Sequence, residues 1–306
     1  MSNILIIKHG SLGDIVQISG ALQDIRNQFK DSKIFILTTF KFKNLFERCP
    51  FIDEVIVDKR LPRWNFFYLL KLIKNIRSFN FETCFDLQNS SRTNFYRKNF
   101  KIKNWSSSLT VLQKGETKKQ FDQEGVIERF KVQLDRSNIN DTSHVLKPDF
   151  SWAIEESFQI KEQKYIFLAP FSSPKLKHKV WPYFKELIQL LKNELPQYEL
   201  ITAPGPSEIS QCKDIGLKMI LNNDKPTSIG QLAKVIKQSS FVIANDTGPA
   251  HIAAHLGCKC VALFGHHTSA KKVSIETEKF KAIESNSLKE ITPEQVLKFV
   301  KDKIFT

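Results

Sequence analysis

Long apolar runs are absent from this sequence of 306 residues. A membrane-spanning helix needs about twenty consecutive apolar residues, and no segment reaches that length. The most apolar early segment, Ile4–Ile7, is followed at once by Lys8, His9 and Gly10. A signal peptide instead carries its charges before its apolar stretch. We therefore expect a cytoplasmic protein, and we leave open a peripheral contact with the inner face of the cytoplasmic membrane.

Cysteines are few and irregularly spaced. Five cysteines, an odd number, do not form a disulfide framework in a chain of this length, which indicates a reducing compartment. Cys258 and Cys260 have no second pair at zinc-finger spacing, and their alternation about a strand start favours packing. Several histidines of the predicted loops also lack ligand spacing: His9, His178, His266 and His267. We expect no metal site.

Acidic residues are outnumbered by basic ones, 32 against 46, which gives a net charge of +14. Residues 1–150 contribute +9 and residues 151–306 contribute +5. Such an excess indicates a polyanionic partner, such as nucleic acid, anionic lipid or an acidic glycan, or simply a lysine-rich composition. Because no RNA- or DNA-reading motif occurs, we expect no nucleic-acid partner. Hydrophobic residues make up 41%, which excludes a disordered chain, and the length allows about two domains.

Short apolar runs alternate with amphipathic stretches, a pattern that predicts βαβ units and parallel sheets. In the first half we expect strands at Ile4–Ile7, Lys33–Thr39, Glu54–Val57 and Thr83–Leu87. We expect helices at Asp14–Phe29, Trp64–Phe79 and near Gln123–Leu134. Residues Ser106–Asp122 read as a loop, and His144–Ser157, with Pro148 and little periodicity, as an interdomain linker.

A second alternating series begins after this linker. Its predicted strands are Tyr165–Ala169, Glu199–Ala203, Lys218–Leu221, Phe241–Ala244 and Lys259–Phe264. Its predicted helices are Pro182–Glu194, Ser207–Ile215, Ile229–Lys237, Pro249–Leu256 and Thr292–Lys303. Two Rossmann-like domains in tandem are the simplest description, with a ligand cleft between the carboxyl ends of the two sheets.

The first segment with chemical content joins the first strand to the first helix. Gly10 and Gly13 permit tight turns and a close backbone approach, and Asp14 follows at the helix start. Asp14 fits two roles: a helix N-cap, or a general base that accepts a proton from an attacking hydroxyl. The Gly-x-Gly-x-x-Gly order of a dinucleotide fingerprint is absent.

The second segment is Asn245–Ala254, where a strand ends and Pro249 suits a first helical turn. Free backbone N–H groups and the helix dipole form an anion site there, well matched to a pyrophosphate. Thr247 adds a hydroxyl donor, and His251 lies one turn inside the helix. Asp246 would repel a phosphate and is expected to accept hydrogen bonds from sugar hydroxyls. The alternative is a capped helix with a satisfied polar cluster.

The third segment, Lys175–Pro182, lies between the first strand and the first helix of the second domain. Its three lysines, Lys175, Lys177 and Lys179, would neutralise a diphosphate leaving group, or form a solvated basic loop. Trp181 precedes a proline at a helix start, and we expect it to pack into the core.

Together these segments resemble glycosyltransferase family 9, the bacterial heptosyltransferases, which transfer heptose from ADP-heptose during assembly of the lipopolysaccharide core. The family carries Gly-x-x-Gly-Asp, Lys-x-Trp-Pro, and Asp-Thr-Gly-Pro-x-His-x-Ala-Ala-x-x-Gly ahead of a Val-Ala-Leu-Phe-Gly-like strand. These motifs correspond to Gly10–Asp14, Lys179–Pro182 and Asp246–Gly265, and Asp86–Arg92 is similar to the family's Asp-Leu-Gln segment. The resemblance runs over nearly the whole chain.

This resemblance implies an α/β protein of the GT-B fold, with two Rossmann-like domains facing each other across a cleft. Residues 1–152 would bind the acceptor, and residues 153–306, with a final helix, the nucleotide sugar. The implied activity is an inverting, metal-independent glycosyl transfer from ADP-heptose or a relative, which is a substrate, so no cofactor is expected. A lipopolysaccharide-core or other acidic glycolipid acceptor would fit the +9 of the first half.

The resemblance also implies site residues. Asp14 would be the catalytic base, on an acceptor-side loop with Gly10, Ser11 and Gly13. The implied donor-binding residues are Ser172, Ser173, Lys179, Glu208, Asp246, Thr247, Gly248 and His251. Two departures flank the donor pocket: Ala250 stands in place of the family's Met, and His266-His267-Thr268 in place of Pro-Thr. They leave the donor sugar and nucleotide open.

Three alternatives remain. The same fold could serve as a nucleotide-sugar epimerase, as a transferase with another sugar or a protein acceptor, or as a catalytically silent nucleotide-binding module. Retention of Asp14 together with Lys179 and Asp246 argues against the silent module. The acceptor, the linkage position and the oligomeric state are left open by the sequence.

Overall fold

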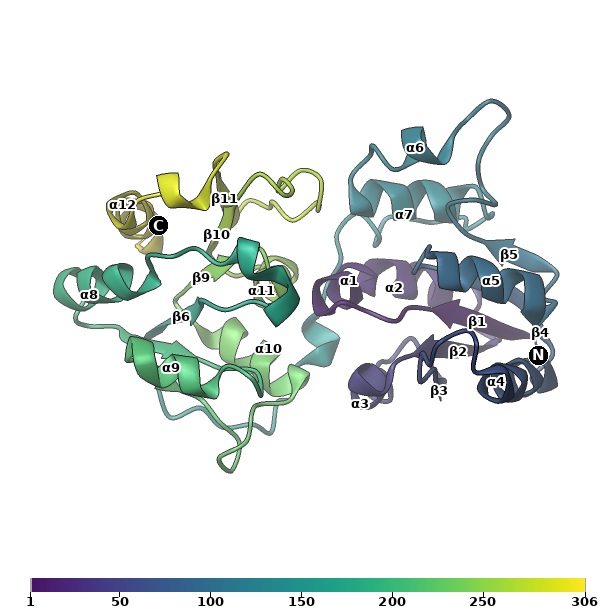
Figure 1. Ribbon diagram of the computed structural model, residues 1–306, viewed down its shortest axis with the longest axis horizontal. Helices are drawn as coiled ribbons and strands as arrows, with labels where there is room; N and C mark the ends of the chain where they lie inside the picture. Colours follow the sequence, from purple (N-terminus) through teal and green to yellow (C-terminus); the bar gives the residue numbers. More distant parts are fainter. Residues whose placement is uncertain (1, 306) are drawn as a thin grey trace. The chain divides into compact units, whose positions relative to one another are not determined.

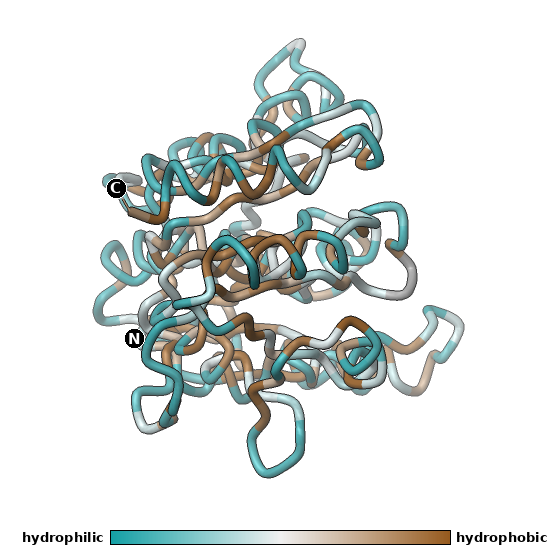
Figure 2. Tube along the Cα trace, turned by 90° about the vertical axis from the view of Figure 1, so that its left-hand side faces the viewer, coloured by the Kyte–Doolittle hydropathy of each residue, from teal (hydrophilic) through white to brown (hydrophobic). Residues whose placement is uncertain are grey.

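The computed structural model describes residues 2–305, except for the side chains of Pro174 and Lys175, and the chain divides into two compact units, Met1–Trp152 and Ala153–Thr306. Each unit is built on a parallel sheet with helices packed on it (Figure 1). The apolar residues lie mainly on the strands and inner helix faces, and the loops are hydrophilic (Figure 2). No helix among the described residues is long and apolar enough to cross a membrane.

The first unit contains a sheet in the order β3-β2-β1-β4-β5, all parallel. Its strands are β1 (Asn3–Ile7), β2 (Lys33–Thr38), β3 (Glu54–Val57), β4 (Phe81–Asp86) and β5 (Asn104–Ser106). Its helices are α1 (Leu12–Gln17), α2 (Ser19–Gln28), α3 (Lys43–Phe46), α4 (Phe66–Ser78), α5 (Ser91–Phe100), α6 (Lys118–Phe121) and α7 (Val126–Asp135), with short 3-10 turns η1 (Phe40–Phe42) and η2 (Ser151–Ala153).

Helices cover both faces of this sheet. Leu69 and Leu72 of α4 and Tyr96 of α5 pack in one cluster with Leu5 and Phe35 of the central strands. On the other face α2 and α7 contact each other, and the ring of Phe29 lies 6.0 Å from that of Phe85. Burial on both faces explains why β1 and β2 are continuous apolar runs.

The second unit has a parallel sheet in the order β11-β10-β9-β6-β7-β8. Its strands are β6 (Tyr165–Ala169), β7 (Glu199–Thr202), β8 (Lys218–Met219), β9 (Phe241–Asn245), β10 (Cys260–Phe264) and β11 (Phe280–Glu284). Its helices are α8 (Phe184–Glu194), α9 (Ile209–Ile215), α10 (Ile229–Gln238), α11 (Gly248–His255) and α12 (Pro293–Ile304), with 3-10 turns η3 (Pro174–Lys179) and η4 (Leu288–Glu290). Trp181, Cys258 and Cys260 are buried, as predicted.

The prediction of one continuous helix over Asp14–Phe29 is wrong. The structure has two helices, α1 and α2, which meet at Ile18. The hydroxyl of Ser19 donates to the carbonyl of Val16 at 2.8 Å, and such a local side-chain bond competes with the helical ladder. Apolar spacing alone did not reveal this break.

Four elements are missing from the sequence prediction: α3, α5, β5 and β11. In addition, α6 lies inside the predicted loop Ser106–Asp122. α5 has only polar side chains in its first turn and begins at a capping box formed by Ser90 and Thr93, while Thr117 and Gln120 form another before α6. Capping therefore defines these two helices where an apolar period is lacking.

The predicted linker His144–Ser157 is wrong over its first part. The buried carboxylate of Asp24 accepts hydrogen bonds from the backbone N–H groups of His144 (3.3 Å) and Val145 (2.8 Å). A Cβ on Gly20 would lie 2.0 Å from the His144 carbonyl oxygen, so this position requires glycine. The segment therefore packs on the first unit, and Val145 and Phe150 are fully buried.

Candidate functional site

The predicted functional segments lie where each sheet reverses its strand order. In the second unit the chain passes from β6 through β7 to β8 at one edge, and returns at β9 on the other side of β6. In the first unit the same reversal separates β1 from β4. Ligands of open α/β sheets bind in the crevice at the carboxyl ends of the strands at such a reversal. The loops after β1, β6 and β9 carry the motifs that the sequence singled out.

In the second unit one buried amide joins the loops that follow β6 and β9. The side-chain oxygen of Asn245 accepts from the N–H of Trp181 at 3.0 Å, and its nitrogen donates to the carbonyl of Pro170 at 2.8 Å. Trp181 is fixed in turn by its indole N–H, which donates to the carbonyl of Ile291 at 2.9 Å. The sequence marked Asn245 only as the end of a strand, so this positioning role was missed.

Asp246 is the centre of a charged cluster. Its carboxylate is 2% exposed, and its Oδ2 lies 2.5 Å from Nζ of Lys179 and 3.0 Å from Nε2 of His267. Nε2 of His251 lies 3.7 Å from Oδ1. Burial acts to raise the pKa of Asp246, but His251 and Lys179 outweigh it and hold this pKa well below its usual range. The structure thus brings together three predicted donor-binding residues: Lys179, Asp246 and His251.

His267 belongs to this cluster although the sequence treated it only as a departure from the family pattern. Its ring lies 5.3 Å from that of His178 and 6.4 Å from that of His266. Burial lowers the pKa of His267, and the hydrogen bond with Asp246 opposes that shift. His267 is therefore a hydrogen-bonding partner of Asp246 whose charged form is disfavoured by burial. Its contact with Asp246 places it beside the residue predicted to contact the donor sugar.

The N-terminus of α11 follows Asp246 directly in the chain. Thr247 is the N-cap residue, with extended backbone, and Gly248 and Pro249 open the first turn. The Thr247 hydroxyl donates weakly to the carbonyl of Asn245 at 3.3 Å, and Thr247 and Gly248 are both half-buried. A helix start of this kind attracts an anion through its dipole and its unpaired donors.

A pocket of about 400 Å³ lies beside this cluster in the second unit. Its lining residues are Phe171, Ser172, Lys177, Val180, Pro182, Ser207 and Gln211. The Ser172 hydroxyl donates to the carbonyl of Leu176 at 2.8 Å. Lys177 and Val180 flank Lys179 along the chain, and a volume of this order suits a small ligand. Ser172 is the predicted site residue that lines this pocket.

Two further predicted site residues of the second unit, Ser173 and Glu208, lie in loops that precede helical segments. Ser173 is exposed and precedes η3, and its carbonyl accepts from the N–H of Leu176 at 2.7 Å. Glu208 precedes α9, and its carboxylate accepts from the N–H of Gly205 at 2.8 Å. The side chain of Lys175 lies outside the described residues.

The loop after β1 carries a buried cation. Lys8 is 3% exposed, and its Nζ donates to the carbonyl of Leu87, beyond β4, at 2.9 Å. Burial lowers the pKa of Lys8, and the charges of Asp14 and Asp86 oppose this shift. Burial also raises the pKa of Asp86, against hydrogen bonds from Thr93, Asn89 and Gln88. Lys8 was read only as the end of the first strand, so its role at this reversal was missed.

Asp14 lies in the first turn of α1 and is half-buried. The N-cap of this helix is Ser11, so an N-cap role for Asp14 is wrong; its Oδ2 accepts from the N–H of Ser11 at 2.7 Å and from its hydroxyl at 2.9 Å. Gly10 has φ +106°, and a Cβ there would lie 2.3 Å from the ring of Phe42, so glycine is required. Gly13 lies inside α1 and is buried, and it forms no turn.

Asp58 is another buried carboxylate of the first unit, and nothing in the sequence signalled its role. Asp58, just beyond β3, accepts from the hydroxyls of Tyr68 and Tyr96 and lies 3.1 Å from Nε2 of His9. Burial acts to raise the pKa of Asp58, but the bonds from His9, Tyr68 and Tyr96 outweigh it and lower this pKa. These partners come from three separate segments, so the cluster depends on the fold.

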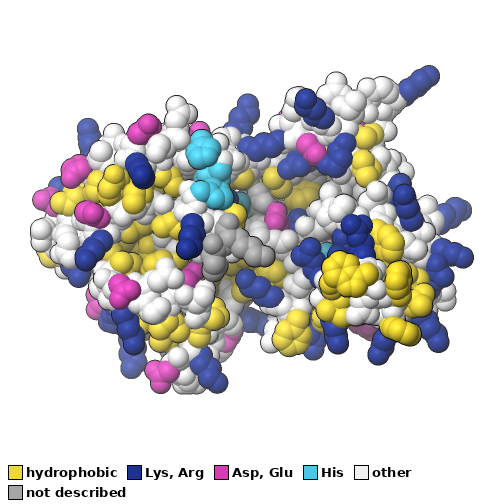
Figure 3. Space-filling view, in the orientation of Figure 1, with side chains coloured by type: hydrophobic (Ala, Val, Ile, Leu, Met, Phe, Trp, Pro, Cys, Tyr) yellow, Lys and Arg dark blue, Asp and Glu magenta, His cyan; other side chains and the backbone are white. Residues whose placement is uncertain are grey.

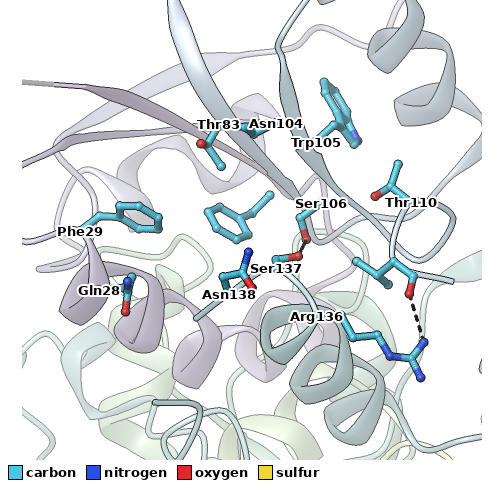
Figure 4. Close-up of a pocket in the computed structure, with 12 residues that line it drawn as sticks. Gln28, Phe29, Thr83, Asn104, Trp105, Ser106, Thr110, Arg136, Ser137 and Asn138 are labelled. Carbon is cyan, nitrogen blue, oxygen red and sulfur yellow. Dashed lines mark hydrogen bonds between the residues drawn. The ribbon is translucent and has the colours of Figure 1, made fainter. Parts of the chain in front are cut away.

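The first unit also has a pocket, and none of the predicted site residues line it. It encloses about 490 Å³ beside β4 and β5. Figure 4 shows polar side chains around it, among them Ser106, Thr110, Ser137 and Asn138. Arg136 at its rim already donates to the carbonyl of Val111 at 3.1 Å and to the carboxylate of Glu116 at 2.5 Å. The described residues contain no group of three or more His, Cys, Asp and Glu side chains placed to hold a metal ion.

Comparison with known proteins assigns the chain to a family. Residues 69–294 match glycosyltransferase family 9 (heptosyltransferase). The chain is 22% identical over 291 residues to lipopolysaccharide heptosyltransferase 1 of Campylobacter coli, a match that covers 86% of this chain and 83% of the relative. It is 25% identical over 283 residues to lipooligosaccharide heptosyltransferase 2 of Campylobacter jejuni, covering 83% and 78%.

Solved structures of similar proteins share the fold. ADP-heptose LPS heptosyltransferase II of E. coli superposes with a TM-score of 0.76 at 19% identity, over 100% of this chain and 99% of that one. The E. coli heptosyltransferase WaaC with ADP gives 0.78 at 16% identity, over 98% and 99%. The paired parallel sheets, the strand-end motifs and the family match together identify the chain as a glycosyltransferase family 9 enzyme with the GT-B fold, similar to heptosyltransferases.

Proposed function

We propose that this enzyme transfers a heptose or a related sugar from ADP-heptose to an acidic glycolipid acceptor of the lipopolysaccharide-core type, with inversion and without a metal ion. The observation that carries the proposal is the ion pair of Lys179 with buried Asp246 at the strand-order reversal, beside the N-terminus of α11. The pair offers a cation for a diphosphate and a carboxylate for sugar hydroxyls within one cluster.

Donor binding follows from the charges of the second unit. Without ligand, Lys179 neutralises Asp246; an arriving diphosphate would compete for this lysine and for the N–H groups at Thr247 and Gly248. Asp246 would then accept hydrogen bonds from the sugar, with His251 and His267 beside it. The pocket that Ser172 lines would receive the nucleoside. A WaaC structure that carries ADP supports a nucleotide-sugar donor for this fold.

Asp14 would supply the base. An acceptor hydroxyl bound on the first unit loses its proton to the Asp14 carboxylate while its oxygen attacks the anomeric carbon. The bond from that carbon to the diphosphate oxygen breaks, and ADP leaves from the opposite face with the bonding electrons, so the configuration inverts. Lys179 and the start of α11 would stabilise the charge that develops on the diphosphate. The Ser11 contacts to Asp14 Oδ2 orient this carboxylate.

The activity is tested by incubating the protein with ADP-heptose and a Kdo-bearing lipid acceptor, and by following ADP release and the mass of the acceptor. We expect the acceptor to gain one heptose and the new linkage to have inverted configuration. ADP binding without any transfer would instead indicate a silent nucleotide-binding module, and sugar conversion without an acceptor would indicate an epimerase.

The base assignment is tested by Asp14→Asn, which keeps the size of the side chain and removes its proton affinity. We expect kcat to fall about a hundredfold to ten-thousandfold, since a positioned base contributes that much, while the affinity for ADP stays within about twofold. Asp31→Asn, at an exposed position of the same unit, is the matched control. An Asp14→Asn variant with normal kcat would remove the base assignment.

A further inference from the structure

Helix α4 of the first unit is apolar on the face that it exposes as well as on the face that it buries. Leu69, Leu72 and Ile76 pack in the core, as an amphipathic helix requires. On the other side Phe67 is 90% exposed and Leu70 is 64% exposed. Two more aromatic side chains stand just before and at the helix start: Trp64, 77% exposed, and Phe66, 69% exposed. A contiguous set of this size on a surface marks an interaction site.

Basic residues surround this apolar face without any acidic neighbour in the chain. Between Asp58 and Glu82 the sequence contains six basic residues and no acidic one: Lys59, Arg60, Arg63, Lys71, Lys74 and Arg77. Phe67, Leu70, Lys71 and Lys74 follow the spacing of one helical stripe, so apolar and basic side chains share a face. Figure 3 shows hydrophobic side chains gathered over the α4 region, with Lys and Arg around them.

The loop that carries Trp64 is held in place from within the unit. Arg92 of α5 donates to the carbonyls of Arg60 (3.3 Å) and Leu61 (2.7 Å), and Asp58 accepts from the N–H of Arg60 at 2.7 Å. The side chain of Asn65 caps α4 by accepting from the N–H of Tyr68 at 3.1 Å. The aromatic side chains are therefore presented outward on a fixed support, and they are not part of a loose loop.

A groove runs along the same helix. It encloses about 520 Å³, and its lining includes the apolar residues Val57 and Leu72 and three lysines, Lys59, Lys71 and Lys74. An apolar floor with cations at its rim suits a molecule with a hydrocarbon part and an anionic head. Lys71 and Lys74, which line the groove, lie on the same helix as the exposed Phe67 and Leu70.

We propose that the face formed by Trp64, Phe66, Phe67 and Leu70, with Lys59, Lys71 and Lys74 around it, docks on an anionic lipid bilayer. Aromatic and apolar side chains insert at the boundary of head groups and acyl chains, and lysines contact the anionic head groups. A second copy of this chain fits less well, because a symmetric contact would bring the lysines of the two faces together, Lys59, Lys71 and Lys74 from each copy. The inference goes beyond the transfer reaction and does not depend on the donor or the acceptor.

The test is co-sedimentation of the full chain with vesicles, without any substrate. We expect binding to vesicles of phosphatidylcholine mixed with phosphatidylglycerol, and much weaker binding to phosphatidylcholine alone. Trp64→Ser combined with Phe67→Ser removes the two most exposed rings of the face and should lower the partition coefficient about tenfold or more. Phe305→Ser, at an exposed phenylalanine of the second unit, is the matched control.

The charge contribution is tested by Lys71→Gln combined with Lys74→Gln. We expect about a fivefold loss per lysine on the anionic vesicles and no change on phosphatidylcholine. Lys185→Gln combined with Lys192→Gln, at exposed lysines of α8, is the control with the same change of charge. All substituted side chains are exposed, so circular dichroism should show unchanged folding.

Two results would overturn the proposal. One is wild-type binding to anionic vesicles no stronger than to phosphatidylcholine, or equal binding by the Trp64→Ser, Phe67→Ser variant. The other is a dimer in sedimentation equilibrium that this variant abolishes, which would assign the face to a second copy. Neither result would bear on sugar transfer, which is measured with ADP-heptose and a water-soluble acceptor in the absence of vesicles.

Discussion

The two strand-order reversals of this protein arrange their charges around groups of opposite sign. At the reversal of the first unit a buried cation, Lys8, has the carboxylates of Asp14 and of buried Asp86 in its electrostatic surroundings. At the reversal of the second unit the buried charge is an anion, Asp246, with Lys179, His251 and His267 around it. Both reversals lie at the strand ends of a parallel sheet, so the difference in charge comes from the residues of the loops.

This difference indicates different tasks. A buried lysine favours ionised carboxylates near it, which is what a group that must accept a proton needs. A buried aspartate forms an ion pair with a lysine beside a helix start, where a diphosphate would compete with the aspartate for that lysine. Under the proposed function, the same sheet geometry would prepare one place for a proton acceptor and the other for an anionic leaving group. Substitutions at four positions, Lys179, Asp246, His255 and Lys8, test the burial and the charges of these two places.

The largest effect is expected when the cation of the second unit is removed. Lys179→Met leaves the Asp246 carboxylate buried without its closest partner, and removing one partner of a buried ion pair costs about 3 kcal/mol. We expect the free energy of unfolding in urea to fall by about that amount. The KM for the donor should rise about tenfold, because a charge-assisted contact to the diphosphate is lost.

A second substitution, at Asp246, separates the effect of Lys179 on stability from its effect on donor binding. Adding Asp246→Asn to Lys179→Met should restore most of the lost stability, because a neutral amide costs less to bury than an unpaired carboxylate. It should not restore donor affinity. Lys185→Met, at an exposed position of α8, controls for the loss of a lysine. If Lys179→Met unfolded like the wild type, the pair would not be the centre of the cluster.

A smaller effect is expected from the buried histidine at the end of α11. Burial, and then the neighbouring His251, lower the pKa of His255 to about 3 in the folded protein, against 6.5 as its ordinary value. Above pH 6.5 this histidine is neutral in both states and contributes no pH dependence. Below pH 6.5 the unfolded chain binds a proton that the folded chain does not, so stability falls by about 1.4 kcal/mol per pH unit down to pH 3.

His255→Leu removes this contribution of His255 to the pH dependence of stability. Between pH 7.5 and pH 5 the wild type should lose about 2 kcal/mol of unfolding free energy through His255, and the variant should lose that much less. His266→Leu, at an exposed histidine of the same unit, should leave the pH dependence unchanged. Equal pH dependence in His255→Leu and the wild type would show that the ring is not held neutral by burial.

Sequence patterns were sufficient to predict those elements that depend on residues close together in the chain. The central strands were predicted within a residue or two because burial on both faces forces continuous apolar runs, as in Tyr165–Ala169. The segments Gly10–Asp14 and Asp246–Gly248 could be assigned to strand ends because glycine and a helix-start proline mark such turns. α5 was missed because its start depends on a capping box at Ser90 and not on an apolar period.

The partners within the site could not be predicted in the same way. The hydrogen bond between Asn245 and Trp181 spans 64 positions of the chain, and the contact of Lys8 with the Leu87 carbonyl spans 79. Nothing in the local composition signals such pairs; they follow from the order of the strands, which brings the ends of β6 and β9, and of β1 and β4, side by side. His267 was noticed as an unusual residue, but its hydrogen bond to Asp246 required the fold.

The smallest effect is expected from the cation of the first unit. Lys8→Met keeps most of the length of the side chain and removes its charge, together with the bond to the Leu87 carbonyl. The cost of that lost bond and the relief of a buried charge oppose each other, so the free energy of unfolding should change by less than about 1 kcal/mol. The effect on catalysis should appear in the pH profile.

With Lys8 gone, the carboxylate of Asp14 loses a nearby cation that favours its ionised form. The acid limb of the kcat profile should therefore move to higher pH, while kcat at pH 8 stays within about threefold. Lys33→Met, at the exposed start of β2, is the control. An unmoved acid limb would mean that Lys8 serves only the packing of the loop after β4, and that the contrast between the two reversals does not extend to the proton acceptor.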